Sequence, residues 1–267
     1  MSNNNEILNQ VQNNKSNNKA KIKEIFASIQ GEGLYIGYKQ LFIRFCGCNL
    51  NCNYCDTDYS AISNYKEYEP IELANEVLKH KDIHSVSLTG GEPLLSVEFL
   101  KEFLPIVKNC HSEAESTNIL CQTQNDVLAE ESHKNNSIKV YLETNATLTE
   151  NLLEIKPYID IISADIKLES ATGIKDSSIL HDKFFEACKG VETFAKVVFN
   201  DKITQSEIDI CSKLAIKHNI PLILQPEMNG NNFTSNPAKY QEIFDKFLSN
   251  YQNVRLIPQV HKFLNVQ

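Results

Sequence analysis

The sequence contains no run of about 18 apolar residues, which is the length that a membrane-spanning helix needs. Its first 21 residues also lack the short apolar core of a secretory signal peptide. Positive charge is in deficit, because 26 Lys and Arg stand against 34 Asp and Glu and give a formal net charge of −8. A field of that sign repels nucleic acid. We therefore expect a cytoplasmic protein with no membrane span and no nucleic-acid partner.

The chain has 267 residues, 42% of them apolar, which suits one large domain with a sizeable core. Residues 1–20 are rich in Asn, Gln and Lys and would bury too little apolar surface to offset the entropy of ordering. We expect them to be a disordered leader, followed by a single domain over 21–267. Within that domain residues 110–137 are polar and aperiodic, which predicts an insertion on the surface.

Short apolar runs alternate with stretches of helical periodicity along the domain. The apolar runs are 40–45, 84–90, 138–145, 159–167, 193–199, 221–226 and 254–259, and the helical stretches are 70–80, 97–109, 205–219 and 237–250. In the first helical stretch the spacing places Ile71, Ala74, Val77 and Leu78 on one face. Alternation of this kind predicts an α/β fold in which helices cover a parallel sheet. We expect an incomplete (β/α) barrel of about six parallel strands, with the site at the C-terminal ends of the strands.

In a cytoplasmic protein, cysteines are expected as thiols or metal ligands rather than as disulfides. Four of the eight cysteines are scattered along the chain, and we expect each to be a buried small apolar residue. These four are Cys110, Cys121, Cys188 and Cys211.

The other four cysteines fall within ten residues, in the segment "RFCGCNLNCNYCDTD" (44–58). Three have the spacing Cys48-x3-Cys52-x2-Cys55. A zinc site usually needs a second pair of ligands roughly 12–20 residues away, and the chain has no such pair. Three thiolates on one loop can bind three irons of a [4Fe–4S] cluster and leave the fourth iron open. Cys46 could replace Cys48 in this set, and its role stays open.

The CxxxCxxC spacing with Tyr54 before the last cysteine resembles the cluster loop of radical S-adenosylmethionine (SAM) enzymes. The resemblance selects Cys48, Cys52 and Cys55 as the cluster ligands. It implies that SAM chelates the open iron, and that an electron from the cluster cleaves SAM to a 5′-deoxyadenosyl radical. The hard chemistry then belongs to the cofactors, and no further catalytic residue is predicted.

The flanking motifs narrow the resemblance. The segments "SIQGEG" (28–33), "FIR" (42–44), "LTGGEPLL" (88–95), "LETNAT" (142–147) and "PQVHKFLNVQ" (258–267) closely resemble the 7-carboxy-7-deazaguanine synthase (QueE) family. The resemblance extends through most of residues 21–267. It implies a carbon–nitrogen lyase of queuosine and 7-deazapurine biosynthesis, the pathway of a tRNA modification. The reaction contracts the ring of 6-carboxy-5,6,7,8-tetrahydropterin to 7-carboxy-7-deazaguanine, with loss of ammonia.

The same resemblance implies Mg²⁺, a flavodoxin or ferredoxin as reductant, and a homodimer. The alternative is an activating enzyme for a glycyl-radical protein, because such enzymes share the cluster loop and a GGEP-like turn. They do not usually carry SIQGEG or the QxHK ending. A non-catalytic iron–sulfur protein is a third interpretation, but it would not need the polar residues at the predicted strand ends.

Residue roles follow from the family motifs and from side-chain chemistry. Gln30 offers donors and acceptors, as a pterin edge requires, and Arg44 suits a carboxylate. An outward-facing arginine and a docked C-terminal tail are the structural alternatives for Arg44 and His261. The resemblance implies that substrate is bound by Ile29, Gln30, Gly31, Arg44, Thr89, His261 and Gln267.

The resemblance places SAM against Tyr54, Gly91, Glu143, Ser163, Asp165 and Lys167. The chain reads Asp-Ile-Lys where many members of the family read Ser-Pro-Lys, and it has Ala146 where Gly is usual. For Mg²⁺ the resemblance implies Thr57, with Asp56 as a second ligand, because the ion prefers hard oxygen atoms. A helix or turn cap is the structural alternative for this pair.

Overall fold

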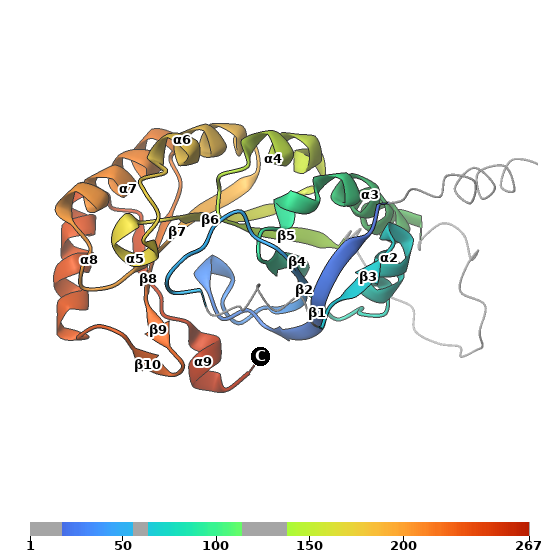
Figure 1. The fold of residues 1–267 in the computed structure, drawn as a ribbon, viewed down its shortest axis with the longest axis horizontal. Helices are drawn as coiled ribbons and strands as arrows, with labels where there is room; N and C mark the ends of the chain where they lie inside the picture. The colour runs from blue at the N-terminus through green and yellow to red at the C-terminus, as the bar shows by residue number, and fades with distance from the viewer. Residues whose placement is uncertain (1–17, 56–63, 114–137, 267) are drawn as a thin grey trace, which may run out of the picture.

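The computed structural model describes residues 18–55, 64–113 and 138–266 (Figure 1). Within these residues a nine-stranded sheet has the order β11-β8-β7-β6-β5-β4-β2-β1-β3. The parallel strands are β2 (Lys39–Phe45), β4 (Ser85–Gly90), β5 (Lys139–Thr144), β6 (Ile161–Ile166), β7 (Glu192–Phe199), β8 (Leu222–Pro226) and β11 (Val254–Leu256). Every one overlaps an apolar run in the sequence, so the predicted incomplete barrel is confirmed, with seven parallel strands in place of about six.

Two antiparallel strands extend the sheet beyond β2. They are β1 (Ala20–Ile29) and β3 (Lys66–Tyr68), and β1 pairs with both neighbours in antiparallel register. The sequence prediction missed these strands. In β1 only Ala20 and Ile22 are buried, so the strand lacks the continuous apolar run of the parallel strands.

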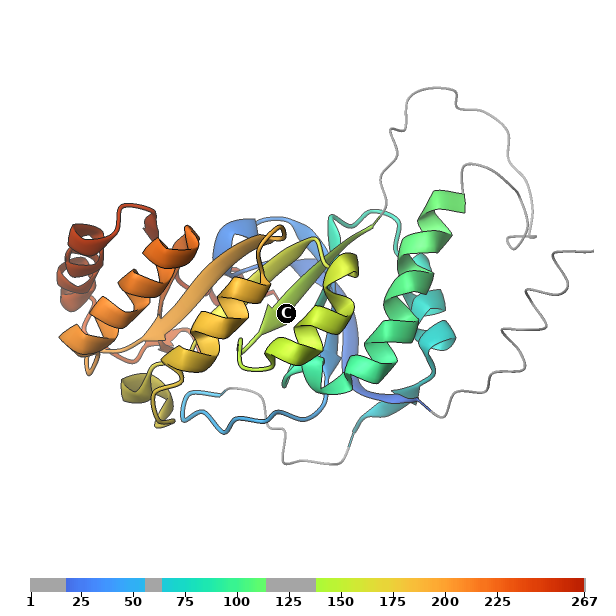
Figure 2. The same ribbon diagram turned by 90° about the horizontal axis from the view of Figure 1, so that it is seen from above.

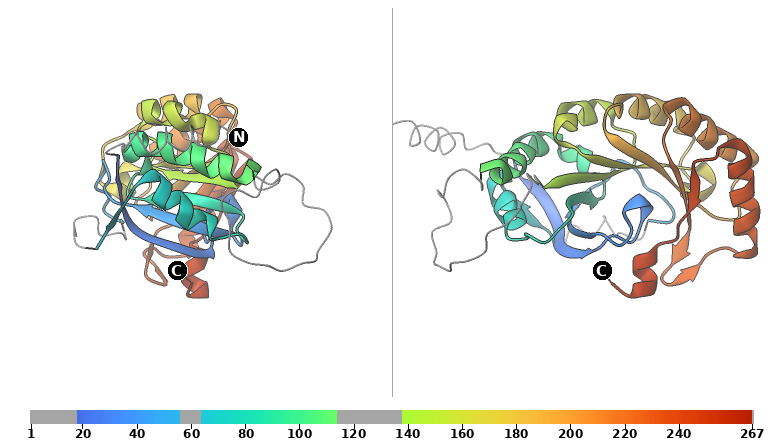
Figure 3. Two further views of the ribbon diagram at one scale, coloured as in Figure 1. Left: turned by 90° about the vertical axis from the view of Figure 1, so that its right-hand side faces the viewer. Right: turned by 180° about the vertical axis from the view of Figure 1, so that it is seen from behind.

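The helices lie on the convex face of the sheet and form an outer arc (Figures 1 and 2). They are α2 (Pro70–Leu78), α3 (Val97–Glu113), α4 (Thr149–Ile155), α6 (Ser178–Ala187), α7 (Gln205–His218) and α8 (Ala238–Asn250). Shorter elements are η1 (Gly33–Tyr35), η2 (Pro93–Ser96), η3 (Lys156–Tyr158), α5 (Glu169–Thr172), β9 (Met228–Asn229), β10 (Asn232–Phe233) and α9 (Val260–Leu264). Seen from behind, η1 lies inside the curve of the sheet, while the β9–β10 hairpin and α9 lie beside its open side (Figure 3). No helix in the described part of the chain is both long and apolar enough to cross a bilayer.

Two apolar clusters determine how deeply a ligand can enter the barrel. The larger cluster fills the space between the sheet and the helices. The smaller one lies on the concave side, where Tyr141, Phe194 and neighbouring strand residues pack against η1. Gly33 in η1 has φ +67°, and a Cβ there would come within 2.6 Å of the Phe194 ring, so this close approach requires glycine. Among the described residues the concave side is therefore filled below, and a pocket opens at the C-terminal ends of the strands.

The predicted face of α2 is confirmed at Ala74 and Val77, but the prediction was wrong about Ile71 and missed Leu73. Ile71 is 45% exposed, whereas Leu73, Ala74 and Val77 are completely buried. The predicted set also satisfies helical spacing, so periodicity alone did not fix the rotation of the helix about its axis. Cys188 and Cys211 are buried, as expected. Residues 1–17 of the predicted leader and residues 114–137 of the predicted insertion lie outside the described residues, and α3 continues to Glu113.

Helix α2 offers a matched test of the core. We expect Leu73→Ala to lower the free energy of unfolding by about 2–5 kcal/mol, because it leaves a cavity at a completely buried position. Ile71→Ala on the same helix should change it by roughly 0.5 kcal/mol or less. Urea unfolding with unchanged m-values measures both variants. Equal destabilisation by the two variants would contradict this packing of α2.

Candidate active site

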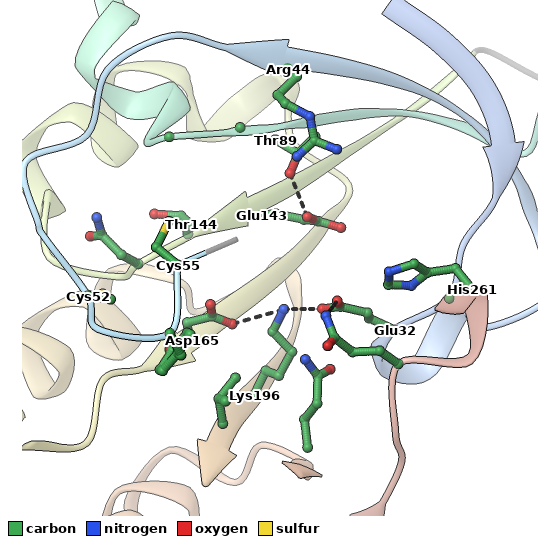
Figure 4. A pocket seen from close by; sticks show the side chains of 18 of the residues that line it. Glu32, Arg44, Cys52, Cys55, Thr89, Glu143, Thr144, Asp165, Lys196 and His261 are labelled. Carbon is green, nitrogen blue, oxygen red and sulfur yellow. Dashed lines mark hydrogen bonds and ion pairs between the residues drawn. The ribbon is translucent and has the colours of Figure 1, made fainter. Parts of the chain in front are cut away.

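A pocket of about 240 Å³ opens at the C-terminal ends of the parallel strands (Figure 4). Its wall combines strand-end residues with the SIQGEG loop, the cysteine loop and the C-terminal helix α9. The predicted site residues that line it are Ile29, Gln30, Gly31, Arg44, Cys48, Cys52, Tyr54, Cys55, Thr89, Gly91, Glu143, Asp165, Lys167 and His261. The predicted residues Asp56, Thr57 and Gln267 lie outside the described residues.

Ser163 is the predicted SAM-binding residue that does not line the pocket. It lies two residues before Asp165 on β6, so it faces the same side one layer deeper, and it hydrogen-bonds Tyr141 of the smaller apolar cluster. Its hydroxyl supports the floor of the pocket, and SAM binding by Ser163 stays a prediction.

The cysteine loop distinguishes the two possible ligand sets. Cys48, Cys52 and Cys55 all line the pocket, whereas Cys46 is not among its lining residues. Gly47, with φ +85°, turns the chain between Cys46 and Cys48. The geometry thus supports the set that includes Cys48.

The cysteine loop rests on the GGEP turn that follows β4. The amide of Glu92 donates to the Gly47 carbonyl at 2.8 Å. A Cβ on Gly91 would lie 1.7 Å from that carbonyl oxygen, so any side chain at Gly91 would push the loop away. The Gly91 amide donates to the Phe45 carbonyl at 3.0 Å, and Gly91 lines the pocket.

The three thiols fit an iron–sulfur cluster better than a single ion. Among the described residues, no three Cys, His, Asp or Glu side chains converge on one point as ligands of one metal ion do. Cluster ligands each bind a different iron and need only surround a common space. Burial raises the pKa of the Cys48 and Cys52 thiols, so binding of iron would have to displace their protons.

One wall of the pocket presents the carboxylate of Glu143. The Thr89 hydroxyl donates to Oε2 of Glu143 at 2.6 Å (Figure 4). Nε2 of Gln30 donates to Oε1 of Glu143 at 3.0 Å. Gln30 also donates to Gln40 at 3.0 Å and accepts from the Glu32 amide at 3.0 Å. The Gln30 amide is therefore held by Gln40 and the Glu32 amide while it donates to Glu143. The geometry groups Glu143 with the residues predicted to bind substrate rather than with those predicted to bind SAM.

Arg44 lies beside this wall with a protein partner of its own. Its Nε donates to Glu24 at 2.6 Å, across the antiparallel pair of β1 and β2. Its guanidinium carbon lies 5.7 Å from the centre of the Phe26 ring, and Phe26 stacks on Phe42 with centroids 5.1 Å apart. These contacts hold the guanidinium at the pocket, where it can meet an anionic ligand through its remaining N–H groups.

A chain of buried and half-buried charges crosses the base of the pocket. The Lys196 ammonium of β7 lies 2.5 Å from Oε2 of Glu32 and 3.3 Å from Oδ1 of Asp165 (Figure 4). The Lys167 ammonium lies 2.7 Å from Oδ2 of Asp165 and 3.1 Å from the Tyr54 hydroxyl. The sequence prediction missed Lys196 and Glu32. A lysine within the apolar run 193–199 was the available signal, because a buried lysine needs an anionic partner.

The ionic contacts determine the protonation of this chain of charges. Burial alone would raise the pKa of Glu32, but Lys196 and the Gln259 side chain more than compensate and lower it to about 2. Burial alone would lower the pKa of Lys196, and the carboxylates of Asp165 and Glu32 raise it well above its usual value. At neutral pH the Glu32–Lys196 pair is therefore ionised.

The C-terminal helix α9 closes the pocket from the open side of the barrel. The Val260 amide donates to the Gly31 carbonyl at 2.9 Å, and Nε2 of Gln259 donates to Glu32 at 2.7 Å. A Cβ on Gly31 would lie 2.4 Å from Nδ1 of His261, so glycine permits this docking. These contacts place the His261 side chain at the pocket, as predicted from the sequence.

His181 of α6 supports the strand ends from outside the pocket. Its Nδ1 lies 3.2 Å from the Ala146 carbonyl, and its Nε2 accepts from the Lys167 amide at 3.2 Å. Both bonds require a neutral ring with the proton on Nδ1. Ala146 has φ +56°, a left-handed backbone conformation. Glycine, which is usual at this position in the family, adopts this conformation with less strain than alanine.

The comparisons with known proteins agree with this geometry. Residues 42–201 match the model of the radical SAM superfamily, and the chain belongs to that superfamily. Membership implies a [4Fe–4S] cluster and SAM as cofactors.

More specifically, the chain belongs to the 7-carboxy-7-deazaguanine synthase family. It is 31% identical to the 7-carboxy-7-deazaguanine synthase of Geobacter sulfurreducens over 92% of this chain and 97% of the relative. It is 33% identical to that of Archaeoglobus fulgidus over 93% of this chain and 100% of the relative. The crystal structure of QueE from Escherichia coli covers 92% of this chain and 100% of its own, with a TM-score of 0.55 at 16% identity, which shows the fold.

The buried His181 predicts acid lability. Burial lowers its pKa from 6.5 to about 4 in the folded protein, so the unfolded chain binds this proton more readily. The stability that the neutral ring contributes is complete above pH 6.5 and is lost as the pH falls towards 4. His181→Gln should flatten the fall in unfolding free energy over this range, because a Gln amide can donate to Ala146 and accept from Lys167 without titrating. Urea unfolding at several pH values measures the slope, and an unchanged slope would contradict the assignment.

Proposed function

We propose that this chain is a 7-carboxy-7-deazaguanine synthase, which contracts the ring of 6-carboxy-5,6,7,8-tetrahydropterin and releases ammonia. The relatives that match it over nearly their full length carry that name. The observation that carries the proposal is a single pocket that joins a three-cysteine loop to a wall built around an oriented carboxylate. The activating-enzyme alternative gains no support, because these full-length relatives are synthases.

Glu143 suits the donor-rich edge of a pterin. The ring N–H and the exocyclic amino group of a pterin are adjacent donors, like two N–H groups of a guanidinium. A carboxylate can accept from both in a bidentate pair. Thr89 and Gln30 hold the two oxygens of Glu143 from the protein side, at 2.6 and 3.0 Å, and so fix the plane of the carboxylate. We assign Glu143 to substrate rather than to SAM on this ground.

The substrate carboxylate needs a cationic partner. Arg44, held by Glu24 and Phe26, is the candidate among the described pocket residues. Mg²⁺ on Thr57 and Asp56 would add a second positive charge, and both residues supply the oxygen atoms that this ion prefers. His261, which lies against Gly31, would close over the pterin from α9.

SAM would lie on the side of the cysteine loop. Cys48, Cys52 and Cys55 would hold the cluster, which together with bound SAM supplies a carbon-centred radical that can remove a hydrogen atom. The Gly91 carbonyl would accept from the SAM amine, and Tyr54 and Lys167 would line the remaining space. A flavodoxin or ferredoxin as reductant and a homodimer are further parts of the proposal.

The activity is tested directly by an anaerobic assay. The protein, reconstituted with iron and sulfide, is incubated with dithionite, SAM, Mg²⁺ and 6-carboxytetrahydropterin, and mass spectrometry follows 7-carboxy-7-deazaguanine. We expect product from the wild type and none from Cys52→Ala. Cys46→Ala is the matched control, because Cys46 shares the loop but does not line the pocket, and this variant should keep iron and activity.

Two outcomes would contradict the proposal. Cleavage of SAM without the deazaguanine product would retain the radical SAM class but exclude this substrate. Loss of iron in Cys46→Ala, together with full activity in Cys48→Ala, would show that the ligand set is the other one.

A further inference from the structure

We propose that Asn145 is a positioning residue that raises the reduction potential of the cluster through an N–H···S hydrogen bond to Cys48. Asn145 follows β5, is 6% exposed, and lines the pocket. Its Nδ2 lies 3.8 Å from the Cys48 sulfur. The inference rests on the proposed ligation by Cys48, but not on the identity of the substrate.

A closed ring of three hydrogen bonds orients the Asn145 amide. Nδ2 of Asn145 donates to Oδ1 of Asn49 at 2.8 Å, and Nδ2 of Asn49 donates to the Thr147 hydroxyl at 2.9 Å. The Thr147 hydroxyl in turn donates to Oδ1 of Asn145 at 2.6 Å. The second hydrogen on Nδ2 of Asn145 is then left to point at sulfur.

The ring of hydrogen bonds could form in either of two directions, and the Cys48 sulfur favours one of them. If both amides were flipped, the ring would still close, but Oδ1 of Asn145 would face the Cys48 sulfur. A carbonyl oxygen against a thiolate is repulsive, whereas an N–H group is attractive. Thiolate at Cys48 therefore favours the observed direction, and the amide donates to it.

The backbone of Asn145 is fixed as firmly as its side chain. Its amide donates to Oε2 of Glu92 at 2.7 Å, and Glu92 is completely buried. The same carboxylate accepts from the Thr144 hydroxyl at 2.9 Å and from the Leu94 amide at 3.1 Å. The GGEP turn, which carries the cysteine loop, is thus joined to the end of β5, and Asn145 cannot easily move away from Cys48.

Cys48 has a second donor in the amide of Leu50, at 3.4 Å. Reduction adds negative charge to a cluster and its thiolates, so donors aimed at a ligand sulfur stabilise the reduced form more than the oxidised form. Removal of one donor should shift the midpoint potential to more negative values. The shift makes the electron transfer that precedes SAM cleavage less favourable.

The test is a potentiometric titration of the reconstituted protein followed by electron paramagnetic resonance, without SAM or pterin. Asn145→Leu removes the donor at nearly constant volume, and we expect a more negative midpoint potential than in the wild type. Asn145→Asp replaces the donor with a negative charge and should shift the potential further in the same direction. Asn151→Leu, a change of the same kind at a helix residue that does not line the pocket, is the matched control and should leave the potential unchanged. Wild-type potentials in both Asn145 variants would overturn the proposal.

A measurement on the unmodified protein covers the case in which the variants do not bind iron. Wild-type protein labelled with ¹⁵N in its asparagine side chains is reconstituted and reduced, again without SAM. Pulsed electron paramagnetic resonance should detect a ¹⁵N coupling to the cluster, and its absence would overturn the proposal. Neither readout uses the pterin, so failure of the proposed reaction and failure of this inference are distinguishable.

Discussion

The pocket depends on the two ion pairs that the Lys196 ammonium makes. The ammonium joins β7 to Glu32 of the SIQGEG loop at 2.5 Å and to Asp165 of β6 at 3.3 Å, and Lys196 is only 7% exposed as a residue. Loss of one partner in a buried ion pair typically costs about 3–5 kcal/mol, because a charge is left without compensation. The three segments are therefore held in one arrangement, although they lie far apart in the sequence.

The chain of charges also organises the pocket into two sides. Asp165 also pairs with Lys167, and Lys167 in turn contacts the hydroxyl of Tyr54 beside the cysteine loop. Glu32 also accepts a hydrogen bond from Gln259, which precedes the helix that carries His261. One continuous set of polar contacts thus fixes the distance between the side that we propose for SAM and the side that we propose for the pterin. Such fixed geometry is what a reaction needs when a hydrogen atom must pass between two bound molecules.

The parallel strands could be predicted from the sequence because strands buried on both faces appear as continuous apolar runs. The motif residues were predicted from the family resemblance, and those that line the pocket meet there because strand ends and glycine turns collect at one edge of such a sheet. The antiparallel β1, half exposed, had no such run. Ion pairs between distant segments were also beyond reach: the sequence shows that Lys196 interrupts an apolar strand, but not that Glu32 lies opposite it. Strand periodicity likewise did not show that Ser163 lies below the pocket while Asp165 lies within it.

The division of the pocket is the central claim, and an anaerobic crystal structure with cluster, SAM and pterin tests it most directly. The account predicts the pterin ring against Glu143, Gln30 and Thr89, and SAM against Tyr54, Lys167 and Gly91, with Lys196 between the two ligands. A structure in which SAM occupies the Glu143 wall, or in which the pterin binds outside this pocket, would contradict it.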